Sequence, residues 1–213
     1  MSPAPGSLDE PDARRLEECL AAGGVAVFPA DTVYGVCCDP DDERAVRRLY
    51  ELKGRSAERP AAVMFFALEP MLSRLSELHD AERTALRALL PGPVTLLLPN
   101  HRSRYSPACG PDPATLGLRV PRLPERLAAL RSVTRPVMQS SANLSGETDA
   151  RRLSDVPESI RAGADLVLDG GELPGTPSTV VDLRDYRASR EWRVLREGAL
   201  GDDAVRELLS SLS

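Results

Sequence analysis

Apolar residues fall into short runs, and several of these runs are separated by segments with helical spacing. The runs VAVFP, AAVMFF, VTLLLP and LGLRVP have the length and composition of buried strands. Between the second and third of them, residues 68–78 and 80–90 predict two helices. Strands that alternate with helices are typical of an α/β sheet.

Two further helices are expected in the first quarter of the chain. The segment DARRLEECLAAGG spaces Leu16, Cys19 and Leu20 as a helix does and ends in glycines that suit a helix stop. The segment DPDDERAVRRLYELKG opens with acidic capping residues, so a helix should lead directly into Lys53 and Gly54.

The second half of the chain is richer in strands than in helices. PVMQS, DLVLDG, STVVDL and EWRVLRE predict further strands, followed by a helix over about 202–212. We therefore expect one α/β domain at 9–213, a twisted open mixed sheet with parallel and antiparallel pairs, after a disordered tail at 1–8. The proline-rich and glycine-rich segment 99–114 is expected to be a long loop.

Composition narrows the classes of function. The chain has 213 residues and a net charge of −5, which argues against nonspecific coating of nucleic acid but allows a local basic cleft. No apolar run approaches the roughly 20 residues that span a bilayer, and the N-terminus is too acidic for a signal peptide, so we expect a cytoplasmic protein. The four cysteines and two histidines lack the spacing of a zinc site.

Basic residues show a strong bias. Of 27 lysines and arginines, Lys53 alone is lysine. An ammonium is compact and flexible where a guanidinium is planar, so this lysine marks a position that needs such a charge, unless it survives by chance in an arginine-rich composition.

Three polar clusters are candidates for chemistry. PADTVYG at 29–35 follows a strand, KGR at 53–55 gathers cations before Arg59, and SSANLSG at 140–146 crowds small polar groups after a strand. PADTVYG and SSANLSG also fit ordinary polar turns, and KGR also fits a solvated basic helix end. The chain contains no GxxxxGK[ST], GxGxxG, GxSxG or HExxH motif, so the residues alone indicate an anion-binding α/β domain.

Seven segments in order carry a resemblance to a known family. PADTVYGVCCDP, LYELKGRSAERP, LLPGPVTLLLP, GLRVP, SSANLSG, STVVDL and VLREGAL resemble the YrdC/Sua5 family of threonylcarbamoyl-adenylate synthases, from about residue 20 to residue 200. The most specific part is the KxR element at Lys53 to Arg55 together with the SxN element at Ser141 to Asn143. The resemblance implies a short, single-domain form with a basic central groove.

The resemblance also implies roles for individual residues. Lys53 and Arg55 are expected to be catalytic. The expected ATP-binding residues are Arg55, Arg59, Thr115, Ser141, Asn143 and Arg196, and the expected threonine-binding residues are Thr32, Arg119 and Ser178. Three departures from the family pattern, at Ala30, Ala61 and Met64, are expected to touch the pocket wall.

The implied reaction joins L-threonine, bicarbonate and ATP, with Mg²⁺, into threonylcarbamoyl-AMP and pyrophosphate for N6-threonylcarbamoyladenosine in tRNA. A tRNA threonylcarbamoyl transferase complex would act downstream, with a weak tRNA contact and no membrane. Two alternatives stay open: a carbamoyltransferase of the same fold that uses carbamoyl phosphate, and a noncatalytic RNA-binding module.

Overall fold

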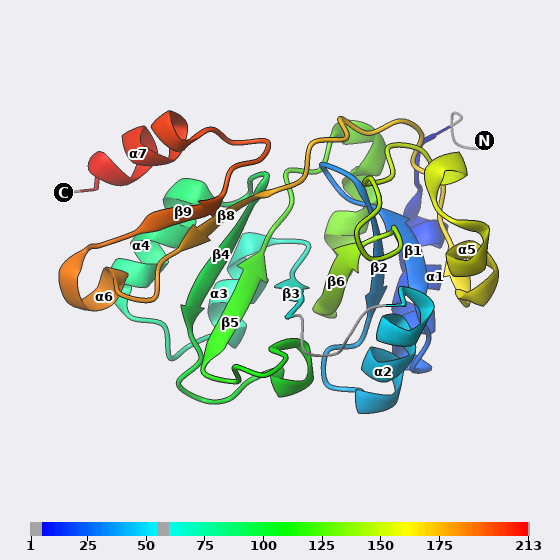
Figure 1. The fold of residues 1–213 in the computed structure, drawn as a ribbon, viewed down its shortest axis with the longest axis horizontal. Helices are drawn as coiled ribbons and strands as arrows, with labels where there is room; N and C mark the ends of the chain where they lie inside the picture. The colour runs from blue at the N-terminus through cyan, green and yellow to red at the C-terminus, as the bar shows by residue number, and fades with distance from the viewer. Residues whose placement is uncertain (1–5, 55–59, 213) are drawn as a thin grey trace.

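The computed structural model describes residues 6–54 and 60–212, and within them nine strands form one sheet. The strand order is β7-β1-β2-β6-β3-β5-β4-β8-β9 (Figure 1). The strands are β1 Ala26–Pro29, β2 Tyr34–Cys38, β3 Ala62–Met64, β4 Val94–Pro99, β5 Thr115–Arg119, β6 Val137–Ser141, β7 Leu166–Val167, β8 Thr179–Asp182 and β9 Arg193–Arg196.

The sheet is mixed, as the sequence predicts. Strands pair in parallel at β1–β7, β3–β5 and β4–β8, and the other neighbours pair antiparallel. Strand β2 was not expected, because the polar start of PADTVYG indicated only a turn. Its residues are all buried, since β2 pairs with β1 on one side and β6 on the other.

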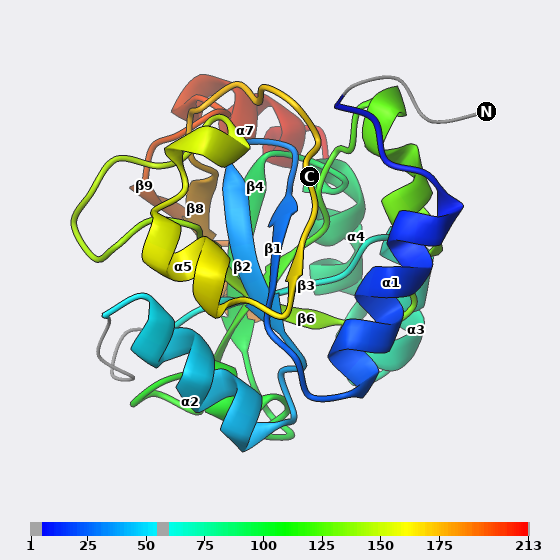
Figure 2. The same ribbon diagram turned by 90° about the vertical axis from the view of Figure 1, so that its right-hand side faces the viewer.

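Helices cover both faces of the sheet. Helices α1, α3 and α4 lie on one face, and α2 and α5 lie on the other (Figure 2). The helices are α1 Glu10–Ala21, α2 Glu43–Leu52, α3 Leu68–Arg74, α4 Asp80–Leu89, α5 Glu158–Gly163, α6 Tyr186–Ser189 and α7 Asp202–Ser210, with short 3₁₀ turns η1 Ser106–Ala108, η2 Glu125–Ser132 and η3 Leu153–Asp155. In the described part of the chain, none of them is both long and apolar enough to cross a membrane.

Helix α2 begins and ends as its sequence indicates. The carboxylate of Asp42 accepts hydrogen bonds from the backbone amides of Arg44 and Ala45, at 2.9 and 3.1 Å. Lys53 is the C-cap residue, and Gly54 follows it with a φ of 55°, a left-handed conformation that glycine adopts without steric cost. The helix therefore delivers Lys53 to a fixed position beside the sheet.

Two segments expected to be irregular are more ordered than the sequence suggests. Leu8 lies within the predicted tail, yet its side chain is buried and its amide donates to the Arg126 carbonyl at 2.9 Å. In the loop over 99–114, the buried Asn100 amide donates to the carbonyls of Arg104 and Pro113, at 2.8 and 2.9 Å. One polar side chain thus adds to the backbone hydrogen bonds of the loop, such as that from the backbone amide of Asn100 to the Ala114 carbonyl at 2.7 Å.

Candidate functional site

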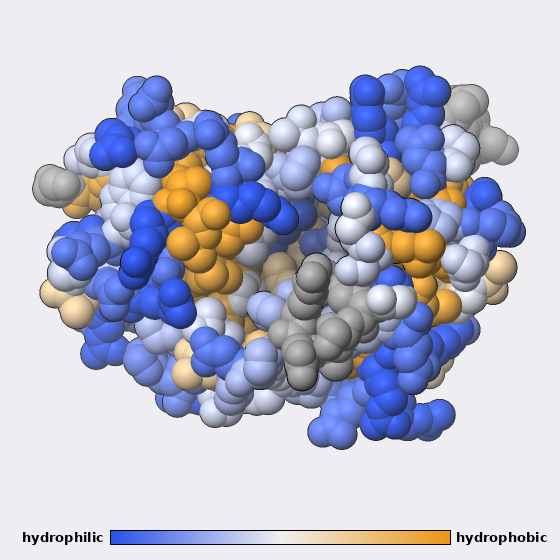
Figure 3. Space-filling view, viewed as in Figure 1, coloured by the Kyte–Doolittle hydropathy of each residue, from blue (hydrophilic) through white to orange (hydrophobic). Residues whose placement is uncertain are grey.

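A cavity of about 420 Å³ lies across the middle of the sheet. In Figure 3 the cavity is visible as a hollow near the middle of the molecular surface. Strands β3, β4, β5, β6, β8 and β9 all contribute to its wall. The lining residues are Val33, Pro60, Ala61, Ala62, Thr95, Leu97, Cys109, Asp112, Thr115, Gly117, Arg119, Gln139, Ser140, Ser141, Asp149, Pro177, Ser178, Val180, Arg184 and Arg196.

Arg119 is a buried cation at the end of β5. Its guanidinium forms an ion pair with Asp31 and donates to the Thr32 hydroxyl at 2.7 Å. Asp31 also accepts the backbone amide of Arg122, at 2.9 Å. A buried charge needs a partner of opposite charge and hydrogen bonds, and these contacts supply both. The PADTVYG turn is therefore held against β5 by the residue that also lines the cavity.

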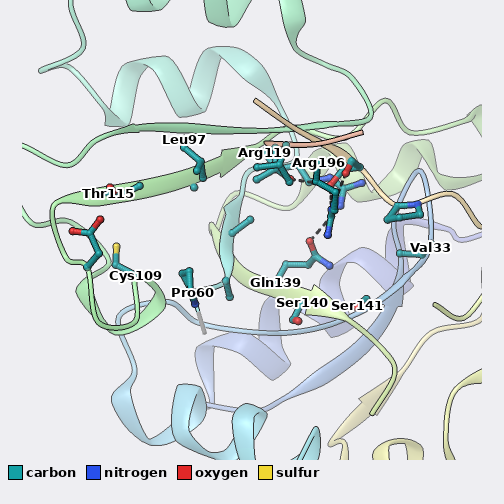
Figure 4. Close-up of a pocket in the computed structure, with 18 of the residues that line it drawn as sticks. Val33, Pro60, Leu97, Cys109, Thr115, Arg119, Gln139, Ser140, Ser141 and Arg196 are labelled. Carbon is teal, nitrogen blue, oxygen red and sulfur yellow. Dashed lines mark hydrogen bonds between the residues drawn. The ribbon is translucent and has the colours of Figure 1, made fainter. Parts of the chain in front are cut away.

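Gln139 joins this network because Gly35 leaves room for it. The Gln139 amide oxygen accepts from Arg119 at 3.4 Å (Figure 4). A Cβ atom at Gly35 would lie only 2.9 Å from the Gln139 side-chain nitrogen and 3.0 Å from the Phe28 ring. The glycine of PADTVYG thus permits a side chain from the neighbouring strand to reach Arg119.

A second arginine lines the cavity from β9. Arg196 donates to the Ser178 carbonyl at 2.7 Å, and the Ser178 hydroxyl lies 2.9 Å from that of Thr95. Its partner is a neutral carbonyl, so its charge remains available to an anion in the cavity.

Lys53 is buried beneath the SSANLSG loop and donates hydrogen bonds to its backbone carbonyls. The side chain is 2% exposed, and its ammonium donates to the Ser141 carbonyl and to the Asn143 carbonyl at 2.8 Å. Asn143 Oδ1 lies 3.3 Å from the Lys53 ammonium and accepts the Ser141 hydroxyl at 2.5 Å. The KxR and SxN elements, about ninety residues apart, therefore meet through Lys53.

The residues predicted for the site fall into three groups. Thr115, Arg119, Ser141, Ser178 and Arg196 line the cavity. Thr32, Asn143 and Lys53 lie behind the wall and bond to lining residues or to the loop that carries one. Arg55 and Arg59 lie outside the described residues.

The three departures from the family pattern do not share one location. Ala61 lines the cavity, as expected. Ala30 and Met64 are fully buried, and neither is among the lining residues of the described chain. The expectation that all three touch the pocket wall is wrong for these two, because their side chains pack in the core instead.

The sequence prediction missed Arg184, Gln139 and Thr95. Arg184 follows β8 and forms an ion pair with the buried Asp182 at 2.8 Å. The hydrogen bond from Arg184 holds the pKa of the Asp182 carboxyl below its usual value. In a chain with 26 arginines, nothing in the local sequence distinguishes Arg184 from a surface residue.

Fold and cavity together define an α/β protein in which loops at strand ends and cations on one mixed sheet surround a space large enough for a ligand. The Sua5/YciO/YrdC family model, described as "Telomere recombination", matches residues 18–198. The chain belongs to this family.

Named relatives agree with this assignment. Threonylcarbamoyl-AMP synthase of Pyrococcus abyssi is 30% identical over 197 residues, which cover 91% of this chain and 56% of that protein. The chain thus spans about half the length of this relative. It covers 98% of threonylcarbamoyl-AMP synthase of Xanthomonas campestris strain B100, at 32% identity over 85% of this chain. The structure of Pyrococcus abyssi Sua5 complexed with L-threonine has a TM-score of 0.78 at 28% identity, and covers 94% of this chain and 58% of that chain.

Gly35→Ala is expected to lower the free energy of unfolding by about 1–3 kcal/mol, because its Cβ would overlap Gln139 and Phe28. Urea denaturation followed by circular dichroism measures this. Gly117→Ala is the matched control, since a Cβ there would meet its nearest neighbour at an ordinary 3.5 Å. Equal stability of the two variants would contradict the close approach at Gly35.

Asp182→Asn is expected to lower the free energy of unfolding by about 1 kcal/mol at pH 7. The pKa of Asp182 is lower in the folded than in the unfolded chain, so its pairing stabilises the fold above about pH 4 and is lost as the pH falls through the folded pKa. The difference from wild type should therefore shrink below about pH 4. Urea titrations at several pH values test this, and a constant deficit down to pH 2.5 would contradict it.

Proposed function

We propose that this chain is an L-threonylcarbamoyladenylate synthase, a nucleotidyltransferase that forms threonylcarbamoyl-AMP and pyrophosphate from L-threonine, bicarbonate and ATP. The observation that carries the proposal is the junction of Lys53 with Ser141 and Asn143 beside a cavity lined by Arg119 and Arg196. The names of the Pyrococcus and Xanthomonas relatives support it.

L-threonine binds at the Arg119 side of the cavity in this proposal. Arg119 lines the cavity, and a guanidinium offers several donors in one plane, which suits a carboxylate even though Asp31 already accepts from one of its nitrogens. The hydroxyls of Thr32 and Ser178 are the expected partners of the polar groups of threonine. The threonine bound to the Sua5 of Pyrococcus abyssi supports a threonine site in this fold.

ATP occupies the remainder of the cavity, with Thr115, Ser141, Asn143 and Arg196 as its expected contacts. Arg55 and Arg59 would add charge to the phosphates. Among the described residues no cluster of three or more His, Cys, Asp and Glu side chains fits a metal. The proposed Mg²⁺ would therefore arrive on the phosphates of ATP, as is usual for this ion.

In the proposed reaction the deprotonated amine of threonine forms a bond to the carbon of CO₂ derived from bicarbonate. A carbamate oxygen then attacks the α-phosphorus of ATP, the bond from that phosphorus to its β-bridging oxygen breaks, and pyrophosphate leaves. Catalysis comes from holding two anions in reacting geometry and from stabilising the charge that develops on the phosphates. Arg196 and the proposed Arg55 supply that charge, and Lys53 fixes the loop that carries Ser141.

The product would pass to a tRNA threonylcarbamoyl transferase complex, with a weak contact to tRNA, in the cytoplasm. These partners and this location are expectations from the family resemblance. A carbamoyltransferase that uses carbamoyl phosphate is not favoured, because relatives that match most of this chain are named synthases. A noncatalytic RNA-binding module is likewise not favoured.

The deciding experiment incubates the purified chain with Mg²⁺, ATP and bicarbonate, with and without L-threonine. We expect threonine-dependent release of pyrophosphate and a product with the mass of threonylcarbamoyl-AMP. A parallel reaction with carbamoyl phosphate in place of bicarbonate and threonine tests the carbamoyltransferase. A folded sample that binds ATP but forms no threonine adducts would overturn the proposal.

Lys53→Arg is expected to reduce turnover by about 10²-fold or more, although the charge is retained. The buried ammonium fits between carbonyls of the loop, whereas a larger planar guanidinium would displace the loop. Pyrophosphate release measures the effect, and circular dichroism confirms that the variant is folded. Arg47→Lys, on the exposed side of the same helix, is the control and should be unaffected. Full activity of Lys53→Arg would mean that chance explains the single lysine.

A further inference from the structure

We propose that Arg184 binds the purine base of ATP, with the plane of its guanidinium against the base, and that Asp182 is the positioning residue that holds it there. This inference rests on the proposed function, in which ATP occupies the cavity. It assigns a role to a residue that the sequence prediction did not include, and it fixes the direction in which the nucleotide lies.

Arg184 is held in one orientation at the edge of the cavity. The carboxylate of Asp182 accepts its Nε at 2.9 Å and its Nη2 at 2.8 Å. Asp182 is 3% exposed and also accepts the backbone amide of Arg184, at 3.1 Å. The remaining nitrogen, Nη1, lies 3.5 Å from the Thr115 hydroxyl on β5. The Arg184 side chain is nevertheless 41% exposed and lines the cavity, so the guanidinium is fixed but accessible.

The charges around Arg184 suit a neutral group better than a polyphosphate. Asp182 offsets the guanidinium charge through both hydrogen bonds, and Asp112 and Asp185 add negative potential near it, since both contribute to raising the pKa of Arg184. Arg196 differs, because its partner is the Ser178 carbonyl. A guanidinium that is paired with a carboxylate still stacks on an aromatic ring.

The cavity floor beside Arg184 is apolar. Leu97 pairs with Asp182 on one side and with Gly117 on the other, and Val180 precedes Asp182 by two residues on the same strand face. Gly117 itself lines the cavity and carries no side chain, so the sheet beside Leu97 presents only backbone at this position. A flat base fits between such a floor and a guanidinium plane.

Opposite ends of the cavity therefore have different chemistry. In Figure 4, Leu97, Thr115 and Cys109 lie toward one side, and Arg119, Arg196 and Gln139 lie toward the other. ATP would lie with its base at the Thr115 end and its phosphates toward Arg196 and Ser141. The α-phosphate would then face the side on which threonine is proposed to bind.

Calorimetric titration of Arg184→Ala with ATP and with inorganic tripolyphosphate tests the inference. We expect the Kd for ATP to rise about tenfold, the loss of one base-stacking contact. The Kd for tripolyphosphate should stay within twofold of wild type, because that ligand has no base. Arg193→Ala is the matched control. Arg193 also pairs with Asp182, at 3.5 Å, but it does not line the cavity, so both affinities should be unchanged.

Each outcome separates this inference from the proposed function. Equal loss of ATP and tripolyphosphate binding in Arg184→Ala would make Arg184 a phosphate contact and overturn the inference. Unchanged ATP binding would overturn it as well. If wild type binds ATP and Arg184→Ala loses base binding, but no adenylate forms with threonine, the base contact stands and the proposed function fails. If wild type does not bind ATP, both fail.

Discussion

The cavity depends on the burial of one charge, the guanidinium of Arg119. Its ion pair with Asp31 and its hydrogen bond to Thr32 tie the turn between β1 and β2 to the end of β5, which lies three strands from β2 in the sheet. Removing Asp31 would leave the buried charge of Arg119 uncompensated, which is far more costly than losing a surface ion pair. A group that is held this firmly presents its remaining donors to a ligand without a further loss of side-chain entropy. The geometry of the wall is thus set before any ligand binds.

Lys53 is a second buried cation, and it holds a loop in place. The SSANLSG loop leaves the sheet at the end of β6. The Lys53 ammonium has several donors and bonds to the carbonyls of Ser141 and Asn143. The glycine after Lys53 turns the chain away from the helix, so the lysine can point back beneath the loop. Two buried cations, Arg119 in a strand and Lys53 at a helix end, therefore hold the PADTVYG turn and the SSANLSG loop in place.

Local pattern predicted most of the fold, because strands such as β4 and helices such as α2 are specified by the spacing of their own residues. Strand β2 escaped prediction, since its burial depends on neighbours that are distant in the sequence. The same limit applies to the site. The motif residues Ser141 and Arg196 were found from a recognisable order of segments, whereas Gln139 gains its place through a contact across the sheet and Arg184 through the burial of Asp182. The burial of Lys53 could not be predicted from the sequence either, because a lysine at a helix end is usually solvated.

The two outer strands of the sheet have a consequence for how copies of this chain behave toward each other. Unpaired backbone groups at a sheet edge invite strand addition from another molecule, which leads to aggregation. Here β7 contributes two residues, and β9 has arginines at both ends. An edge of two residues offers too little backbone for stable pairing, and like charges at β9 would repel the same strand of a second copy. The sheet can therefore keep two unpaired edge strands, β7 and β9, without pairing with the edge of a second copy and aggregating.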